Sequence, residues 1–431
     1  MRTRFATPLA LAVGIAAALA TPWALAASTP AAQATDTSEL AALRAQVAEL
    51  TRRLDELTQK ADTTQVTAQA AQDAAQAADQ RTAQLEQQTK TLVATQASAT
   101  RVVSHLGGYG FANFVAPQNG NSVFSQVGFN PIFHYSYDDK VFFEGELELE
   151  AEEDGSTSTA LEFANINWLF SDNAMLVAGK FLSPLGNFRQ NLHPAWINRF
   201  ATMPLGFMDG GAAPIADVGL QLRGSFVMGA AGQLNYSGFV TNGPTLEADG
   251  DELEAIATEG GTGNADGNFT VGGRVGWLPV PTLEIAGSYA RGRVSVTSID
   301  GLEAEDEPTR SYRFYGADLN WQPVKGLDFR AEYARQRAGS AEASIAPDAA
   351  VWRTWYTQAA YRFSGTPWEL VARYGDFKSN NAMMSGSQFG TGLNYWLTAS
   401  TVIKAGYEFA NPDSPMSTVG DRFIMQLAHG F

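Results

Sequence analysis

The chain has 431 residues, no cysteine, and 45 acidic against 29 basic residues, giving a formal net charge of −16. This negative charge argues against nucleic acid as a partner, and the absence of cysteine excludes disulfide frameworks and cysteine-ligated metals. The histidines stand alone at His105, His134, His193 and His429, with no helical i, i+3 or i, i+4 pair. The sequence therefore predicts neither a metal site nor a cofactor.

Residues 1–26 have the pattern of a secretory signal peptide. Two arginines precede an apolar run over 9–20, and Ala24, Leu25 and Ala26 have the A-x-A form of a cleavage site. Prolines on both sides of the run limit it to fewer than the roughly 20 residues that span a bilayer, which disfavours a membrane anchor. We expect cleavage after residue 26 and a linker over 27–37.

Residues 38–100 have the spacing of an α-helical coiled coil. Apolar residues recur at steps of three and four, which is the a/d pattern, at Leu40, Leu43, Val47, Leu50, Leu54 and Leu57. The pattern continues to residue 92 with alanine at most seam positions, without glycine or proline. A single amphipathic helix or a flexible linker is the alternative for the alanine-rich half, because alanine seams bury little area.

Residues 101–431 contain about sixteen segments in which polar and apolar residues alternate. Short and long connections also alternate, which is typical of an antiparallel outer-membrane β-barrel with short periplasmic turns and longer external loops. A terminal aromatic, Phe431, closes the last segment, which must pair with the first because an open edge is not tolerated in lipid. The predicted strands are 102–115, 123–138, 140–152, 158–170, 174–184, 217–228, 231–242, 268–279, 282–296, 310–323, 326–339, 351–364, 366–378, 386–398, 400–411 and 421–431.

The alternation assigns one face of each strand to lipid and the other to water. In the third strand Glu144, Glu146, Glu148 and Glu150 alternate with apolar residues, and carboxylates facing lipid at mid-membrane would be destabilising. A soluble strand with one solvated face would explain one such segment, but the split recurs along the chain. Other pore-lining candidates are Lys180, Arg223, Arg274, Arg330, Glu332, Arg362, Arg373, Lys404 and Glu408.

The longest connection, residues 185–216, differs from the other long loops. Those loops are acidic, as at 247–252 and 303–307, and should stay solvated. This one is rich in aromatic and aliphatic residues and carries Arg189, His193, Arg199 and Asp209. We expect it to fold into the lumen as a pore constriction, and an external cap or a trimer-contact latch is the alternative.

Several stretches resemble the phosphate-selective porin O/P family and its relatives with N-terminal coiled coils. They are VFFEGELELE at 141–150, LEFANINW at 161–168, AGKFLSPLG at 178–186, LHP at 192–194 and HLGGYG at 105–110. The resemblance implies a sixteen-stranded trimeric channel whose third loop constricts the pore. Phosphate-selective members carry rows of arginine and lysine, whereas the glutamate row of this chain would repel anions.

These features together predict an outer-membrane porin of a Gram-negative bacterium, with its coiled coil in the periplasm. Its expected partners are membrane lipid, two further copies in a homotrimer, and small hydrophilic or charged permeants. With Arg189 and Arg199 at the narrowest point, we expect a weak anion preference or near neutrality. The alternative is a structural anchor whose coiled coil reaches the cell wall. No nucleophile motif such as G-x-S-x-G lies on a suitable turn, which disfavours an enzyme.

Overall fold

The computed structural model describes residues 43–65, eight helical positions between 69 and 90, and residues 102–431 except 265, 416, 418 and 419. The chain divides into two units, residues 1–96 and 97–431, which are treated separately below. The predicted signal peptide, the linker over 27–37 and the first seam residue, Leu40, lie outside the described residues, as does most of the alanine-rich seam.

In the first unit, residues 43–65 form an α-helix. Ion pairs between Arg52 and both Glu49 and Glu56, at i−3 and i+4, support the helix on its polar side. Five seam side chains are 57–66% exposed: Leu43, Val47, Leu50, Leu54 and Leu57. No helix among the described residues is long and apolar enough to cross a membrane. A leucine stripe this exposed favours burial against a partner helix, and the coiled coil over 38–100 stays a prediction.

Replacing Leu50 and Leu54 with serine is expected to abolish self-association of the helical segment. Each buried leucine contributes roughly 1.5–3 kcal/mol, which alanine cannot replace. Circular dichroism and sedimentation of residues 36–100 should show a helical oligomer for the native sequence and a mainly unfolded monomer for the double variant. Thr51→Ser with Thr58→Ser, off the seam, is the matched control. A native segment that is monomeric and non-helical at high concentration would contradict the coiled coil.

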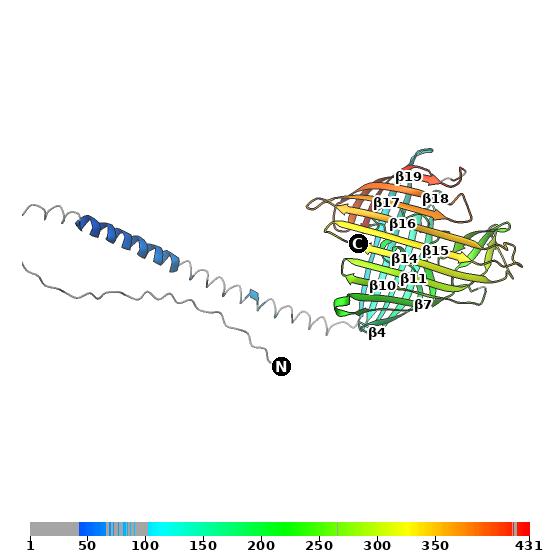
Figure 1. The fold of residues 1–431 in the computed structure, drawn as a ribbon, viewed down its shortest axis with the longest axis horizontal. Helices are drawn as coiled ribbons and strands as arrows, with labels where there is room; N and C mark the ends of the chain where they lie inside the picture. Colours follow the sequence, from blue (N-terminus) through cyan, green and yellow to red (C-terminus); the bar gives the residue numbers. More distant parts are fainter. Residues whose placement is uncertain are drawn as a thin grey trace, which may run out of the picture. The chain divides into compact units, whose positions relative to one another are not determined.

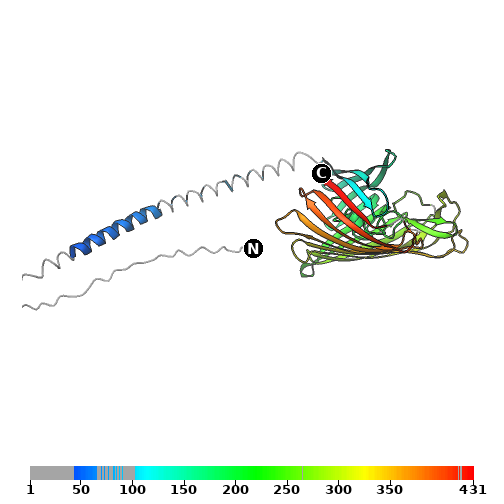
Figure 2. The same cartoon turned by 90° about the horizontal axis from the view of Figure 1, so that it is seen from above.

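The second unit is a closed antiparallel barrel of sixteen strands (Figure 1), which confirms the predicted fold class. β20 pairs with β1 from Gly430 opposite Tyr109 to Arg422 opposite Pro117, so no edge is left unpaired (Figure 2). The strands of the barrel are β1 Val102–Pro117, β2 Val123–Tyr137, β3 Val141–Ala151, β4 Thr157–Ser171, β5 Ala174–Leu182, β6 Ala216–Val227, β7 Gln233–Thr241, β10 Thr270–Val280, β11 Leu283–Val294, β14 Arg310–Trp321, β15 Leu327–Ala338, β16 Ala350–Arg362, β17 Trp368–Lys378, β18 Gly386–Trp396, β19 Thr401–Pro412 and β20 Arg422–Gly430.

Short turns join the strands at one end of the barrel, called here the short-turn end, and longer segments join them at the other, the long-loop end. Side chains alternate between the two faces as the sequence predicts. Phe143 and Leu147 are exposed on the outer face of β3, whereas Glu146 between them is buried. Large aromatic side chains, including Trp168, Trp277 and Trp321, are also exposed on the outer face, as expected of membrane-interface girdles.

The expectation that the acidic long loops stay solvated holds for their acidic side chains but not for the apolar residues among them. These loops form a separate four-stranded sheet in the order β13-β12-β8-β9. Its strands are β8 Thr245–Asp249, β9 Glu252–Ala257, β12 Val296–Ile299 and β13 Leu302–Glu303. Their carboxylates remain largely exposed, but Leu246, Leu253 and Ile256 are buried. In β8 alternation buries Leu246 and Ala248, and Leu253 and Ile256 of β9 join the same hydrophobic core.

The hydrophobic core contains the segment between β5 and β6. Phe188 and Phe207 of this segment belong to the same buried cluster as Phe314 of β14 and Trp352 and Tyr356 of β16. The Phe207 and Tyr356 rings meet edge to face with their centroids 5.1 Å apart. The segment is therefore held by apolar packing as well as by the polar contacts described next.

Candidate functional site

Residues 183–215 connect β5 to β6 and pack against the inner wall of the barrel. The backbone N–H groups of Asn187 and Phe188 donate to the Glu332 carboxylate Oε2 on β15, at 3.2 and 2.8 Å. On β18 the Asn394 amide Nδ2 donates to the Arg199 carbonyl at 2.8 Å. The segment includes one π-helical turn, η1, Phe188–Leu192. These contacts place its backbone against the inward-facing side chains of the wall.

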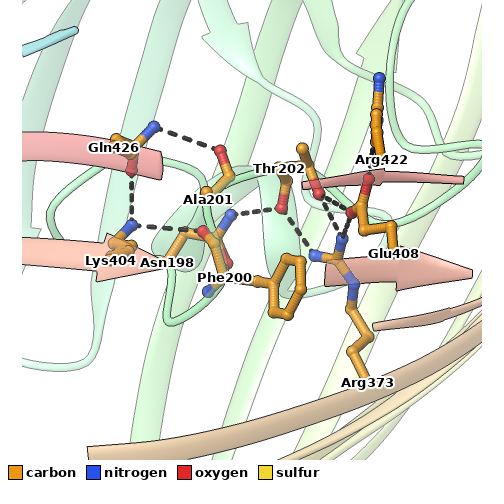
Figure 3. A network of polar contacts seen from close by, with 9 residues as sticks. All are labelled: Asn198, Phe200, Ala201, Thr202, Arg373, Lys404, Glu408, Arg422 and Gln426. Carbon is orange, nitrogen blue, oxygen red and sulfur yellow. Dashed lines mark hydrogen bonds and ion pairs between the residues drawn. The ribbon is translucent and has the colours of Figure 1, made fainter. Parts of the chain in front are cut away.

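A buried carboxylate on β19 holds the middle of the segment (Figure 3). Glu408 is fully buried and pairs with Arg373 (Nη2 to Oε1, 3.2 Å) and Arg422 (Nε to Oε2, 2.7 Å). The Thr202 hydroxyl also donates to Glu408. Arg373 donates to the Thr202 carbonyl at 2.6 Å, and its guanidinium carbon lies 4.5 Å from the Phe200 ring centroid. A buried charge is tolerated only when it is paired and hydrogen-bonded, as Glu408 is.

Lys404 and Gln426 bind the backbone of the same segment (Figure 3). The Lys404 ammonium donates to the Phe200 carbonyl and, at 2.7 Å, to the Gln426 side-chain oxygen. It also donates to the Ala195 carbonyl. The Gln426 amide donates to the Ala201 carbonyl at 3.1 Å. Four predicted pore-lining side chains thus contact the segment instead of open space: Glu332, Arg373, Lys404 and Glu408. Alternation correctly predicts that these side chains face the interior of the barrel. The interior space beside them is filled by the packed segment.

The cavity at the long-loop end has a volume of about 800 Å³ and an acidic lining. Six carboxylates border it: Glu148, Glu150, Glu153, Glu162, Asp209 and Glu259. The basic groups are Lys180, Arg189 and Arg422, with His193 nearby. Arg189 Nη1 lies 3.9 Å from Glu162 Oε1, and Arg422 pairs with Glu408. Two of the three cations are therefore already paired, and by formal charge the acidic groups of the lining outnumber the basic ones.

Closer to the short-turn end than this cavity, the inner faces of β2, β3 and β4 carry asparagines and glutamates, most of them buried. Asn130 Nδ2 lies 3.5 Å from Glu146 Oε1. Asn167 Nδ2 donates to Glu144 Oε2 at 3.4 Å and to Asn165 Oδ1 at 2.6 Å. Sequence reasoning did not single out these asparagines, although their inward positions in the alternation could have indicated them.

Arg199 and Arg362 lie at the short-turn end. Arg199 Nη1 is 3.5 Å from Glu369 Oε2, and the two guanidinium carbons lie 5.2 and 5.0 Å from the Trp396 ring centroid. Arg199, Arg362 and Glu369 border a cavity of about 470 Å³ that includes the turn at 322–326. The structure therefore separates Arg199 from Arg189, which the sequence had placed together at the narrowest point.

Two further cavities at the short-turn end have volumes of about 370 and 320 Å³. The first is bordered by Arg223 and Arg274, and the second by Arg330. Arg223 Nη2 donates to Asn167 Oδ1 at 3.1 Å. The other two arginines pair with carboxylates on the wall: Arg274 Nη2 lies 2.6 Å from Asp318 Oδ1, and Arg330 Nε lies 2.6 Å from Asp328 Oδ1.

The turn η1 borders cavities at both ends of the barrel. Arg189 lines the cavity at the long-loop end, whereas Asn191, two residues further on, lines both of the cavities just described. One helical turn thus separates the two sides. Among the described residues, no group of three or more His, Cys, Asp or Glu side chains is placed to hold a metal ion.

Several solved structures share this fold, although no family model and no curated protein matches the chain. Salmonella typhi OmpF in complex with daunomycin is 15% identical, with a TM-score of 0.51, covering 76% of this chain and 97% of that one. The outer membrane channel DcaP of Acinetobacter baumannii is 10% identical, with a TM-score of 0.51 and coverages of 78% and 99%. An anion-selective porin from Comamonas acidovorans is 12% identical, with a TM-score of 0.51 and coverages of 77% and 100%. The fold of this chain is that of outer-membrane porins.

Proposed function

We propose that this protein is an outer-membrane porin, a passive diffusion channel for small hydrophilic or charged solutes. The observation that carries the proposal is the closed sixteen-stranded barrel whose polar interior holds cavities at both ends. Barrels of this strand number are wide enough for an aqueous channel. The short-turn end would face the periplasm and the long-loop end the exterior.

The segment 183–215 would form the constriction of this channel. Its support is the position of η1, which borders the cavities of both ends. Arg189, His193 and Asp209 would lie beside a permeating solute on the external side, and Arg199 would act nearer the periplasmic mouth. The narrowest part of a pore dominates its resistance, so the position of η1 would set the conductance.

The channel would favour cations. The cavity at the long-loop end has six carboxylates against three basic groups, two of which already pair with acids. Arg199, one of the two arginines behind the expected anion preference, borders a different cavity. Membership of the phosphate-selective porin O/P family would be compatible with the fold, but phosphate selectivity is not what this lining favours.

Association as a homotrimer would account for the exposed leucine stripe of residues 43–57, because three parallel helices could bury it. The same stripe also favours the second candidate function, a structural anchor whose periplasmic coiled coil extends toward the cell wall. In that case the barrel would serve mainly to hold the protein in the membrane.

Planar-bilayer recording of the purified full-length protein tests the proposal. A porin should give discrete, ohmic single-channel steps in symmetric salt. A barrel that inserts, as shown by heat-modifiable mobility and lipid co-flotation, but gives no conductance would be plugged. That result would reject the porin function and leave the anchor.

A further inference from the structure

The outer surface of the barrel carries a group of arginines at its long-loop end. They lie on four consecutive strands of the barrel, and their neighbours along each strand, such as Ala290, Phe314 and Thr354, are buried inside. Alternation therefore directs the arginines outward. This arginine band consists of Arg291 on β11, Arg313 on β14, Arg335 and Arg337 on β15, and Arg353 on β16.

Strand register places these arginines directly beside one another. Arg291 is opposite Arg313, which is opposite Arg337 on its other side. In the second row Arg335 is opposite Arg353, which is opposite Lys378 of β17. Like charges directly opposite on neighbouring strands destabilise the pair unless something compensates them.

The described residues offer the band no compensating acid. None of its five arginines forms a hydrogen bond or an ion pair with another described residue. The two adjacent cations differ: Arg293 Nε donates to the Thr309 hydroxyl at 2.8 Å, and Lys378 pairs with Asp376 and Asp413. In a chain with a net charge of −16, five uncompensated arginines side by side point to an external anion.

The depth of the band matches that of lipid headgroups. On each of the four strands, an arginine of the band lies two residues from an exposed, outward-facing aromatic residue, on its long-loop side. The aromatic residues are Tyr289, Tyr315, Tyr333 and Trp355. Such aromatics mark the membrane interface, so the arginines lie at the headgroup level of the outer leaflet. At this end β17 carries Lys378, whose charge is paired with Asp376 and Asp413. Other neighbouring strands have uncharged outward residues, such as Val240 and Val271 on one side and Phe389 and Phe409 on the other. The band is therefore a local feature of β11 to β16.

We propose that the arginine band binds the phosphate groups on the headgroup of an outer-leaflet lipid. A guanidinium presents paired N–H donors that match phosphate oxygens, and its charge is permanent. Bound phosphates would also reduce the cross-strand repulsion, which no carboxylate of the described residues compensates by an ion pair. This site lies on the outside of the barrel and does not depend on the pore being open.

Native mass spectrometry of the full-length protein in detergent tests this proposal, with diphosphorylated lipid A as the probe. Arg313→Gln, Arg337→Gln and Arg353→Gln together should weaken binding at least tenfold, because each arginine near an anionic headgroup contributes about fivefold. The matched control replaces Arg44, Arg52 and Arg53 of the first unit with glutamine, which changes the net charge equally and should leave lipid binding unchanged.

Two further arms identify the source of the phosphate and keep the test independent of folding. Wild-type protein should bind the dephosphorylated lipid at least tenfold more weakly, and the triple arginine-to-lysine variant at the same positions should keep most of the binding. Millimolar inorganic phosphate should not displace the lipid. Equal binding of phosphorylated and dephosphorylated lipid, undiminished binding by the glutamine variant, or displacement by inorganic phosphate would each overturn the proposal.

Discussion

Deleting residues 190–212 should raise the single-channel conductance several-fold. The segment fills the inner side of the wall from β15 to β20, and η1 lies between the cavities of the two ends. Because the narrowest section contributes most of the resistance, its removal would open the channel over its whole length. Single-channel recording in symmetric salt measures the effect directly.

A deletion in an exposed external loop provides the control. Removing 302–306, which carries mostly exposed acidic residues, should change conductance little. The large deletion removes Leu192, Phe207 and Ala212 from the buried apolar cluster, so a second, smaller variant guards against misfolding. Glu408→Gln leaves Arg373 with weaker pairing and should loosen the segment, producing frequent transitions between conductance levels. If both variants conduct like the wild type, the segment is not the constriction.

Replacing Glu148 and Glu150 with glutamine should bring the selectivity of the channel close to neutrality. Both carboxylates border the cavity at the long-loop end, and neither has an ion-pair partner within 4.0 Å among the described residues. Charges in a narrow, partly enclosed passage are screened less than charges in open water, where the Debye length is about 8 Å at physiological salt. Reversal potentials under a salt gradient should show a cation preference for the wild type that the double variant largely loses.

Glu303→Gln with Glu305→Gln is the matched control for this variant. It removes the same two charges, but from exposed positions in an external loop, and should leave the reversal potential nearly unchanged. The cation preference should also strengthen as the salt concentration falls, because screening weakens. A wild-type channel that prefers anions, and loses this preference on Arg189→Gln, would show that the arginine rather than the carboxylates governs permeation.

The sequence by itself determined the barrel, its strand order and the face of most side chains. The third strand, predicted at 140–152, spans Val141–Ala151, and its glutamates point inward as predicted. This succeeds because alternation with period two and the lengths of connections are local properties. Facing lipid or water is decided residue by residue along a strand.

The tertiary structure decided which inward charges meet each other and which outward ones become neighbours. The sequence pattern predicts Glu332 and Glu408 as pore-lining residues. In the structure, each binds the backbone or a side chain of a segment more than 140 residues away in the chain. The pairing of β8 with β12, and the rows that join Arg291 to Arg313 and Arg337, depend on register between separate strands. Alternation rules out a shift of one residue, which would exchange the two faces, but a shift of two residues keeps every face and changes every cross-strand partner. No local pattern in the sequence therefore fixes which charges become neighbours.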